Sequence, residues 1–397
     1  MGYYKDKQIE FDSRGFSDIF GYICADCVND DYLKNWIIEN DASKEEVCSY
    51  CGQLKKSISM ELFTKKIMET INFYYEDVNN YGEQVYNGDI CAIYDTEDIL
   101  QTIADKLGID FNSKLINDLK PVIQEKTWCK SDPYGLDIDE SLKYSWQRFS
   151  NLIKHKSRYM FFSEKTPSDS GVLSPLEILE NIASDLKNYN MIHDLPSNTT
   201  LFRCRAFNKK EEIKTNVEEL VSPPDNLAKA NRMSAEGISV FYGAFKKDVA
   251  LRESTTKSSS YTVCAEFKTL QTFNCLDLTK IKGLKCPSFF DIEHYKEAEM
   301  YHFYHYLNKQ LVLPVSDFAS IRYAPIQVFA EYCKTILGVD AIIYESAKVR
   351  GNKCIVLFFN KQECLGNESP YFPQPPKLEL KKAETYSITP NYSYDRI

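Results

Sequence analysis

The chain has 397 residues, of which 43% are hydrophobic and 13% aromatic, and its formal net charge is −9. This length predicts two or three domains. The acidic balance argues against a nucleic-acid partner and against attachment to a membrane surface. Because thirteen cysteines occur without a secretory leader or an apolar run that would span a membrane, we expect a cytoplasmic protein with reduced thiols.

Residues 1–60 contain two Cys-x-x-Cys pairs, which we interpret as zinc knuckles. Twenty residues separate the two pairs, whose members are Cys24, Cys27, Cys48 and Cys51. Two such pairs present four thiolates to one tetrahedral ion, so the expected zinc site is closed and structural rather than catalytic. Free surface cysteines or a redox pair are the alternatives.

Residues 61–190 are predicted to form a helical domain. Apolar positions follow a helical period over Met60–Tyr75 and again over Thr96–Leu107, where Gly108 has the position of a C-terminal cap. A third helix begins at Ser174-Pro175-Leu176-Glu177, which combines a serine cap, a proline in the first turn and a glutamate for the capping box.

The pattern changes near residues 188–198, and residues 198–365 are predicted to form a second, catalytic domain. Six short runs there have the composition of strands: Thr200–Phe207, Ile238–Ala244, Tyr261–Phe267, Phe273–Leu278, Ala341–Tyr344 and Lys353–Phe359. A helix is expected over Pro325–Leu337, ending at Gly338. Residues 366–397 are expected to be an extended, proline-rich tail. The whole chain therefore has an α+β pattern, with a mixed sheet in the C-terminal domain.

Three residue types that suit nucleotide chemistry surround the predicted strand Ile238–Ala244. They are an arginine, a tyrosine and a glutamate: Arg232, Tyr242 and Glu253. A fixed cation, an aromatic face and a carboxylate are what a site needs to hold a dinucleotide and break its glycosidic bond. Three other carboxylates compete with Glu253 for the catalytic position: Glu236, Asp248 and Glu266.

Several motifs in the same order resemble the RES family. They cover about residues 198–362 and consist of Phe202-Arg203, Arg232-x(4)-Gly237-x(3)-Phe241-Tyr242-x-Ala244, Ala250-x-x-Glu253, Tyr323-x-Pro325-x-Gln327 and Tyr344-x-Ser346. The resemblance implies a fold like that of ADP-ribosyltransferases. It also implies a toxin that consumes NAD by splitting the bond between nicotinamide and ribose, with water or phosphate as acceptor.

The family also implies roles for individual residues. Arg232, together with Arg203, would hold the diphosphate, and Tyr242 would stack on nicotinamide or ribose. Glu253 would stabilise the positive charge that develops on the ribose, and Ser346 would offer a hydroxyl to the phosphate or ribose. Arg205 is an alternative to Arg203, because residues two apart on a strand point to the same side.

The segment Trp146–Tyr159, taken with the cysteine pairs, resembles the N-terminal domain that is fused to RES domains and grouped with the HEPN superfamily. Arg148 and His155 have the widest spacing that the HEPN ribonuclease motif allows, and seven positions bring both to one helix face. Our preferred interpretation is a helix face that packs on the RES domain; a ribonuclease site or RNA-sensing patch is the alternative.

The expected function is degradation of NAD by a toxin or antiphage defence effector, which stops growth by depleting NAD. Three other functions stay open at this point: transfer of ADP-ribose to a macromolecule, HEPN-type RNA cleavage, and NAD sensing by a non-catalytic zinc protein. The expected partners are NAD, a regulatory protein or antitoxin, and further copies of the same chain. The sequence leaves the acceptor and the activating signal undetermined.

Overall fold

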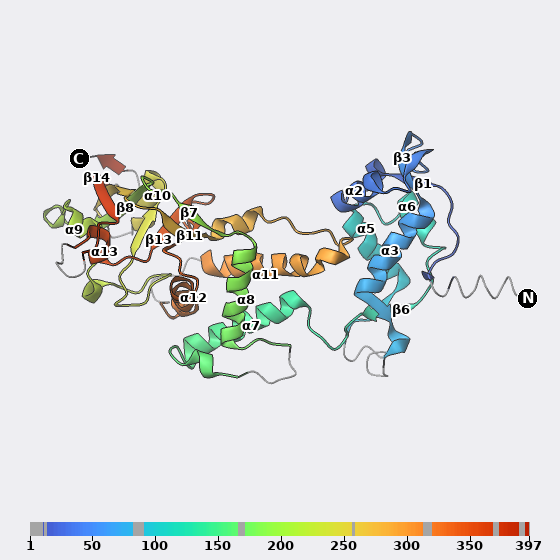
Figure 1. Cartoon of the computed structure of the whole chain (residues 1–397), viewed down its shortest axis with the longest axis horizontal. Helices are drawn as coiled ribbons and strands as arrows, with labels where there is room; N and C mark the ends of the chain where they lie inside the picture. Colours follow the sequence, from blue (N-terminus) through green and yellow to red (C-terminus); the bar gives the residue numbers. More distant parts are fainter. Residues whose placement is uncertain are drawn as a thin grey trace, which may run out of the picture. The chain divides into compact units, whose positions relative to one another are not determined.

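The computed structural model describes residues 11, 14–81, 91–165, 171–255, 259–312, 320–367, 373–388 and 394–396 (Figure 1). Contacts divide the chain into two units. Unit 1 is Met1–Ile138 with Lys285–His302, and unit 2 is Asp139–Leu284 with Phe303–Ile397. Within the described ranges, no helix combines the length and the apolar character needed to cross a membrane. The four-part division of the chain drawn from the sequence stays a prediction.

Unit 1 contains two small sheets, and all their strand pairs are antiparallel. The first has the order β1-β3-β2, with β1 (Tyr22–Cys24), β2 (Lys44–Val47) and β3 (Leu54–Ser59). The second has the order β4-β6-β5, with β4 (Tyr75–Asp77), β5 (Tyr94–Asp95) and β6 (Thr127–Lys130). The first sheet carries both cysteine pairs at its ends.

The helices of unit 1 pack around one apolar core. They are α2 (Asp31–Glu39), α3 (Met60–Tyr74), α5 (Thr96–Leu107) and α6 (Lys114–Leu119). The two helices predicted from periodicity are thus confirmed to within one residue, and Gly108 caps α5 in the left-handed conformation, with φ of 63°. Phe290 is fully buried in this core, which explains why residues 285–302 belong to unit 1.

Unit 2 is built on a mixed sheet of nine strands with the order β15-β14-β10-β8-β9-β13-β12-β11-β7. Its strands are β7 (Ile192–Leu195), β8 (Thr200–Phe207), β9 (Phe241–Ala244), β10 (Tyr261–Thr269), β11 (Phe273–Asp277), β12 (Ala341–Glu345), β13 (Lys353–Leu357), β14 (Leu378–Ile388) and β15 (Tyr394–Arg396). The pair β11–β12 is parallel, whereas the other pairs are antiparallel. The predicted α+β class with a mixed C-terminal sheet is confirmed.

Seven further helices lie in the rest of the described residues. They are α7 (Ile138–His155), α8 (Pro175–Asn188), α9 (Val217–Leu220), α10 (Lys247–Ser254), α11 (Tyr295–Val312), α12 (Ala324–Thr335) and α13 (Lys361–Leu365). Short 3-10 turns complete the chain: η1 (Ala25–Cys27), η2 (Val78–Asn80), η3 (Phe161–Ser163), η4 (Lys210–Glu212), η5 (Asp225–Leu227), η6 (Leu278–Gly283), η7 (Ile292–His294) and η8 (Ser320–Tyr323). The capping box predicted at Ser174 and Glu177 is present at the start of α8.

Two segments differ in detail from the sequence-based expectation. The strand predicted over Ile238–Ala244 is limited to β9, because Ile238 N donates to Ala235 O at 3.1 Å and forms a turn with Gly237, whose φ is 83°. The predicted extended tail contributes β14, which pairs with β10 along nearly its whole length. Parts of that tail, residues 368–372, 389–393 and 397, lie outside the described residues.

Alternation along the strands gives the sheet two buried faces. On β10, Val263, Ala265 and Phe267 join the main core, whereas Cys264 between them packs with Leu251 of α10 on the other face. On β13, Ile355 and Leu357 likewise join the main core, whereas Cys354 packs with Val249 and Ala250 of α10. Helix α10 therefore covers the face of β10 and β13 on which Cys264 and Cys354 lie.

Candidate functional site

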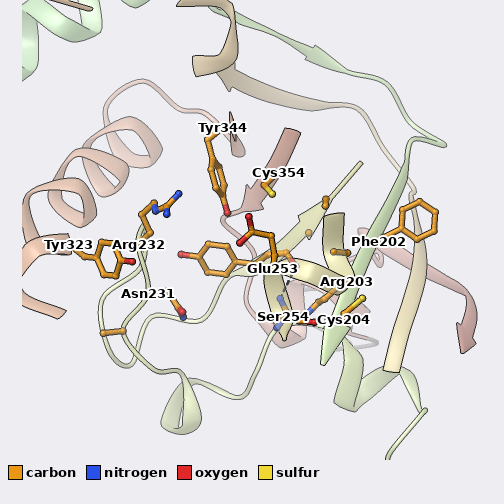
Figure 2. A pocket seen from close by; sticks show the side chains of 15 residues that line it. Phe202, Arg203, Cys204, Asn231, Arg232, Glu253, Ser254, Tyr323, Tyr344 and Cys354 are labelled. Carbon is orange, nitrogen blue, oxygen red and sulfur yellow. Dashed lines mark hydrogen bonds between the residues drawn. The ribbon is translucent and has the colours of Figure 1, made fainter. Parts of the chain in front are cut away.

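A cavity of about 560 Å³ lies within unit 2, beside α10 (Figure 2). Its lining comes from β8, β9, β12, β13, α10, the loop before β9 and the end of η8. The side chains predicted from the arginine, tyrosine and glutamate motif all line it: Arg203, Arg232, Tyr242 and Glu253. Figure 2 shows Arg232 and Tyr323 on one side of Glu253, and Arg203 with Cys204 on the other.

Glu253 is held at the cavity wall by a turn that is distant in sequence. Ser346, directly after β12, donates a hydrogen bond from its hydroxyl to Glu253 Oε1. The backbone N–H of Lys348 is 3.4 Å from the same carboxylate oxygen and 3.2 Å from Ser346 Oγ. Because Oε1 receives these donors, the geometry of the glutamate is fixed while the carboxylate remains part of the cavity wall.

Ser346 itself is 2% exposed, so it acts on the site through Glu253. Its hydroxyl oxygen also accepts a hydrogen bond of 2.9 Å from Val349 N. The sequence suggested a hydroxyl offered to phosphate or ribose, whereas the structure brings this hydroxyl to the carboxylate of Glu253. Tyr344-x-Ser346 lies at the site, as the sequence predicted. The contact of Ser346 differs from the expected one, because its partner is the Glu253 carboxylate.

Tyr242 connects β9 to the loop that carries Arg232. Its hydroxyl oxygen accepts a hydrogen bond of 3.0 Å from Met233 N, the residue after Arg232. Gln327 of α12 holds the same loop from the other side, because its amide nitrogen donates to Asn231 O at 2.7 Å and to Ser234 O at 3.1 Å. The position of Arg232 therefore depends on three hydrogen bonds that Tyr242 and Gln327 make with backbone groups beside it.

Arg232 lies against an aromatic ring at the edge of the cavity. The guanidinium carbon is 5.6 Å from the centroid of the Tyr344 ring, a cation–π distance. Burial raises the pKa of Tyr344 well above its ordinary value, so the phenol stays neutral at physiological pH. A guanidinium stacked in this way keeps its planar fork of donors for an anion.

Arg203 has a more enclosed environment than Arg232. Its Nη1 donates to Tyr242 O at 2.9 Å, and its guanidinium carbon is 5.2 Å from the centroid of the Phe241 ring. Burial lowers the pKa of Arg203 to about 10, a value at which the group is still charged at neutral pH. Arg205, the alternative from the sequence, is exposed and forms a salt bridge of 2.9 Å with Glu219.

The structure distinguishes Glu253 from the competing carboxylates. Glu236 and Asp248 are exposed, and Glu266 lies on β10. Unlike Glu253, these three residues do not line the cavity. The thiol of Cys354 also lines the cavity. Its burial, and to a lesser extent the negative charge of Glu253, raise the pKa of Cys354 to about 12. Among the residues described as lining the cavity, Glu253 thus supplies the one carboxylate.

The four predicted zinc ligands come together in unit 1. Cys24, Cys27, Cys48 and Cys51 place all their Sγ atoms within 4.8 Å of one another. Three separations are 3.6–3.7 Å, between Cys24 and Cys27, Cys24 and Cys51, and Cys27 and Cys48. A regular tetrahedron with Zn–S bonds of about 2.3 Å has S···S edges of ~3.8 Å.

The backbone around the cysteines has the form of a knuckle. Gly52 adopts the left-handed conformation, with φ of 69°, and its N–H donates to Cys48 O at 2.9 Å. Tyr50 N is 3.5 Å from Cys48 Sγ, which is the backbone-to-sulfur contact of a thiolate ligand. The donor set and its spacing therefore fit a structural zinc ion.

The two residues of the alternative ribonuclease site lie on one helix, as their spacing indicated. Arg148 is half-buried on α7, and His155 is exposed as the last residue of that helix. Between them, Phe149, Leu152 and Ile153 are buried, so the adjacent face of α7 packs against its unit. This packing agrees with the preferred interpretation of α7 as a docking helix, which stays a prediction.

Two residues that shape the site had no role assigned from the sequence. Gln327 belongs to a recognised motif, yet its contacts to the Arg232 loop depend on how α12 is placed. Lys348 lies two positions after Ser346, and no local pattern marks it. The contacts of both residues become visible only in the folded structure.

Two family models match separate parts of the chain. Residues 41–167 match the HEPN/RES N-terminal domain 1, and residues 200–380 match the RES domain. No curated protein matches the sequence. Among solved structures, a chain of the M. tuberculosis MbcT–MbcA toxin–antitoxin complex is similar over 53% of this chain and 94% of its own length, with 12% identity and a TM-score of 0.28. The protein thus carries a RES domain, preceded by a HEPN/RES N-terminal domain.

Proposed function

We propose that the RES domain cleaves the nicotinamide–ribose bond of NAD, as a glycohydrolase or a phosphorylase. The observation that carries this proposal is the fixed carboxylate of Glu253 in a cavity that also contains two guanidinium groups and three tyrosine rings. Nicotinamide in NAD is already a cationic leaving group, so its departure needs no strong acid. The reaction needs a negative charge near the ribose, where an oxocarbenium-like cation develops.

Glu253 supplies that charge. The carboxylate is oriented before the reaction by the Ser346 hydroxyl and the Lys348 N–H, so little reorganisation is needed as the bond breaks. Preorganised charge of this kind typically contributes about 10²–10³ in rate. Within the described part of the chain, the hydrogen bonds to the Glu253 carboxylate go to Oε1. We therefore assign Oε2 to a ribose hydroxyl or to the developing cation.

Arg232 and Arg203 have different roles in binding NAD. We assign the diphosphate to Arg232, because its guanidinium stacks on Tyr344 and leaves the edge with its donors for phosphate oxygens. Arg203 is partly used by Tyr242 O, so its contribution is positive potential and a secondary contact. The ring of Tyr242 offers a face to nicotinamide or ribose, while its hydroxyl fixes the Arg232 loop.

The biological role that we propose is that of a toxin or defence effector that acts by NAD depletion. It rests on the RES domain, and the HEPN/RES N-terminal domain is proposed to regulate the cavity. A regulatory protein or antitoxin and further copies of the chain are the proposed protein partners. The zinc ion that the four cysteines fit would stabilise unit 1 and take no part in the reaction.

The test is to incubate the purified full chain with NAD and to separate the products by chromatography. Release of nicotinamide, lost in Glu253→Gln, supports the proposal, and a wild-type protein that releases none contradicts it. A requirement for inorganic phosphate identifies a phosphorylase. Radiolabel from NAD that becomes attached to a macromolecule indicates a transferase, and binding of NAD without turnover indicates a sensor. RNA cleavage that His155→Ala abolishes would indicate the HEPN alternative.

A further inference from the structure

The helix that carries Glu253 ends without a standard cap. The last carbonyl groups of a helix have no partner inside it, and a left-handed glycine usually satisfies them. Helix α10 ends at Ser254, and its cap residue, Thr255, is extended, with φ of −82° and ψ of 132°. The Thr255 hydroxyl donates to Leu251 O at 2.6 Å, which leaves the carbonyls of Arg252 and Glu253 to be satisfied from elsewhere.

Lys348 satisfies these carbonyls with its side chain. Its Nζ donates to Arg252 O at 3.0 Å, to Glu253 O at 3.0 Å and to Thr255 O at 2.9 Å. A lysine ammonium has three donors, and all three are accounted for by this end of α10. The positive charge also lies at the negative end of the helix dipole, where a cation is favoured.

The same residue reaches Glu253 from a second direction. The N–H of Lys348 points to Glu253 Oε1 and to Ser346 Oγ, at 3.4 and 3.2 Å. Lys348 thus contacts Glu253 at both its main chain and its carboxylate. Together with the Ser346 hydroxyl, these contacts connect the turn after β12 to the end of α10, more than 90 positions away in the sequence.

The turn that presents Lys348 is itself firmly bonded. It connects β12 and β13, and Ser346 N donates to Asn352 O at 2.8 Å across it. Gly351 is left-handed, with φ of 75°, and its N–H donates to Glu345 Oε1 at 2.7 Å. A turn held in this way can transmit the position of the sheet to the end of α10.

We propose that Lys348 is a positioning residue for the reaction at Glu253. It fixes the last turn of α10, and through that turn the direction of the Glu253 carboxylate, without touching the substrate. This inference rests on the proposed function of Glu253 in NAD cleavage. Orientation errors of about 1 Å in a catalytic group reduce rates by about 100-fold, so loss of such an anchor reduces kcat more than it weakens substrate binding.

The exposure of Lys348 makes the proposal testable in a folded protein. Lys348 is exposed, whereas Ser346 is buried, so a substitution at 348 removes donors without opening a cavity. Lys348→Met keeps the length of the side chain and removes the charge, and Lys348→Arg restores donors that reach the same carbonyls. Lys282→Met is the matched control, because Lys282 pairs with Glu345, the residue before Ser346.

The experiment measures steady-state nicotinamide release and hydrogen exchange on the full-length variants. In Lys348→Met we expect kcat to fall about tenfold or more with KM for NAD within about twofold of the wild type, and faster amide exchange over residues 251–255. In Lys348→Arg we expect recovery to within about threefold of the wild-type kcat. Lys282→Met is expected to resemble the wild type in both measurements.

Two results would overturn the assignment: unchanged kcat and exchange in Lys348→Met, or an equal loss of kcat in Lys282→Met. If the wild-type chain releases no nicotinamide, the proposed function fails. The exchange measurement then still decides the structural part, because unchanged protection of residues 251–255 in Lys348→Met would show that this lysine does not hold α10.

Discussion

The hydroxyl of Ser346 donates a hydrogen bond to the carboxylate of Glu253, 93 positions away in the sequence. This contact joins the turn after β12 to the last turn of α10, and it gives the carboxylate one direction at the cavity wall. Because Ser346 Oγ also accepts hydrogen bonds from Lys348 N and Val349 N, its proton is directed toward Glu253.

Substitution of Ser346 by alanine is therefore expected to reduce turnover. Ser346→Ala leaves Glu253 with the weaker Lys348 N–H contact alone, so kcat for nicotinamide release should fall about 10- to 100-fold. KM for NAD should change little, since the hydroxyl is buried behind the carboxylate. Steady-state kinetics measure kcat and KM separately. A rise in KM with unchanged kcat would instead place Ser346 in direct contact with the substrate.

Glu253→Gln should cause a larger loss than Ser346→Ala. The amide keeps the shape of the side chain but removes the negative charge, so we expect a reduction in kcat of at least about 100-fold. Glu236→Gln is the control, because Glu236 is exposed, precedes Gly237 in the neighbouring motif and lies outside the cavity lining. Wild-type turnover in Glu253→Gln would assign the catalytic charge to another group.

Tyr242→Phe tests how the Arg232 loop is fixed. The substitution keeps the aromatic face and removes the acceptor of the Met233 N–H hydrogen bond, which is worth about 0.5–1.5 kcal/mol. We expect KM for NAD to rise about 2- to 10-fold through loss of order at Arg232, since RT ln 10 is about 1.4 kcal/mol. Gln327→Ala removes the other anchor of the loop and should raise KM similarly. Steady-state kinetics of nicotinamide release check both variants, and a wild-type KM in both would mean that the loop needs neither anchor.

The cysteine cluster should determine metal content and the stability of unit 1. The full-length protein is expected to contain about one zinc ion per chain by mass spectrometry under native conditions. Cys24→Ser with Cys27→Ser should abolish this zinc and lower the melting temperature, and a chelator should act in the same direction. Cys286→Ser, which changes an exposed cysteine outside the cluster, is the control. Equal zinc content in the double variant and the wild type would exclude the proposed ligands.

Glu384 should make the stability of unit 2 depend on pH. Hydrogen bonds from Lys247, Lys382 and Tyr386 hold the pKa of this buried carboxyl well below its ordinary value. A carboxyl with a depressed pKa in the folded state contributes stability that is present above its unfolded pKa of about 4.3 and is lost as pH falls toward the folded value. Glu384→Gln should therefore destabilise the protein by about 1–3 kcal/mol at pH 7, with a smaller difference below about pH 4.

Thermal unfolding followed between pH 3 and pH 8 measures this effect. The control is Glu379→Gln, since Glu379 lies on the same strand and forms a surface pair with Lys381 that should contribute less than about 1 kcal/mol. A constant difference between Glu384→Gln and the wild type over the whole range would contradict the assigned linkage.

Much of the secondary structure could be predicted from the sequence, because it depends on local chemistry. The helices at Met60–Tyr74 and Thr96–Leu107, the capping box at Ser174 and the left-handed Gly108 all follow from periodicity and capping within a few residues. The zinc knuckles follow in the same way, since each Cys-x-x-Cys pair is a local unit. One error has a local cause: the turn from Ala235 to Ile238, with its left-handed Gly237, makes β9 start later than the composition predicts.

The sequence by itself determined which residues are candidates for the site, and the tertiary structure decided what each of them contacts. The order of the motifs identified Arg232, Tyr242 and Glu253, which all line one cavity. The fold alone separated Arg203 from Arg205, turned Ser346 toward Glu253, and placed Lys348 at the end of α10. The physical reason is that these hydrogen bonds, which span 14 to 95 positions, depend on how the strands and α10 pack, and no local pattern encodes that packing.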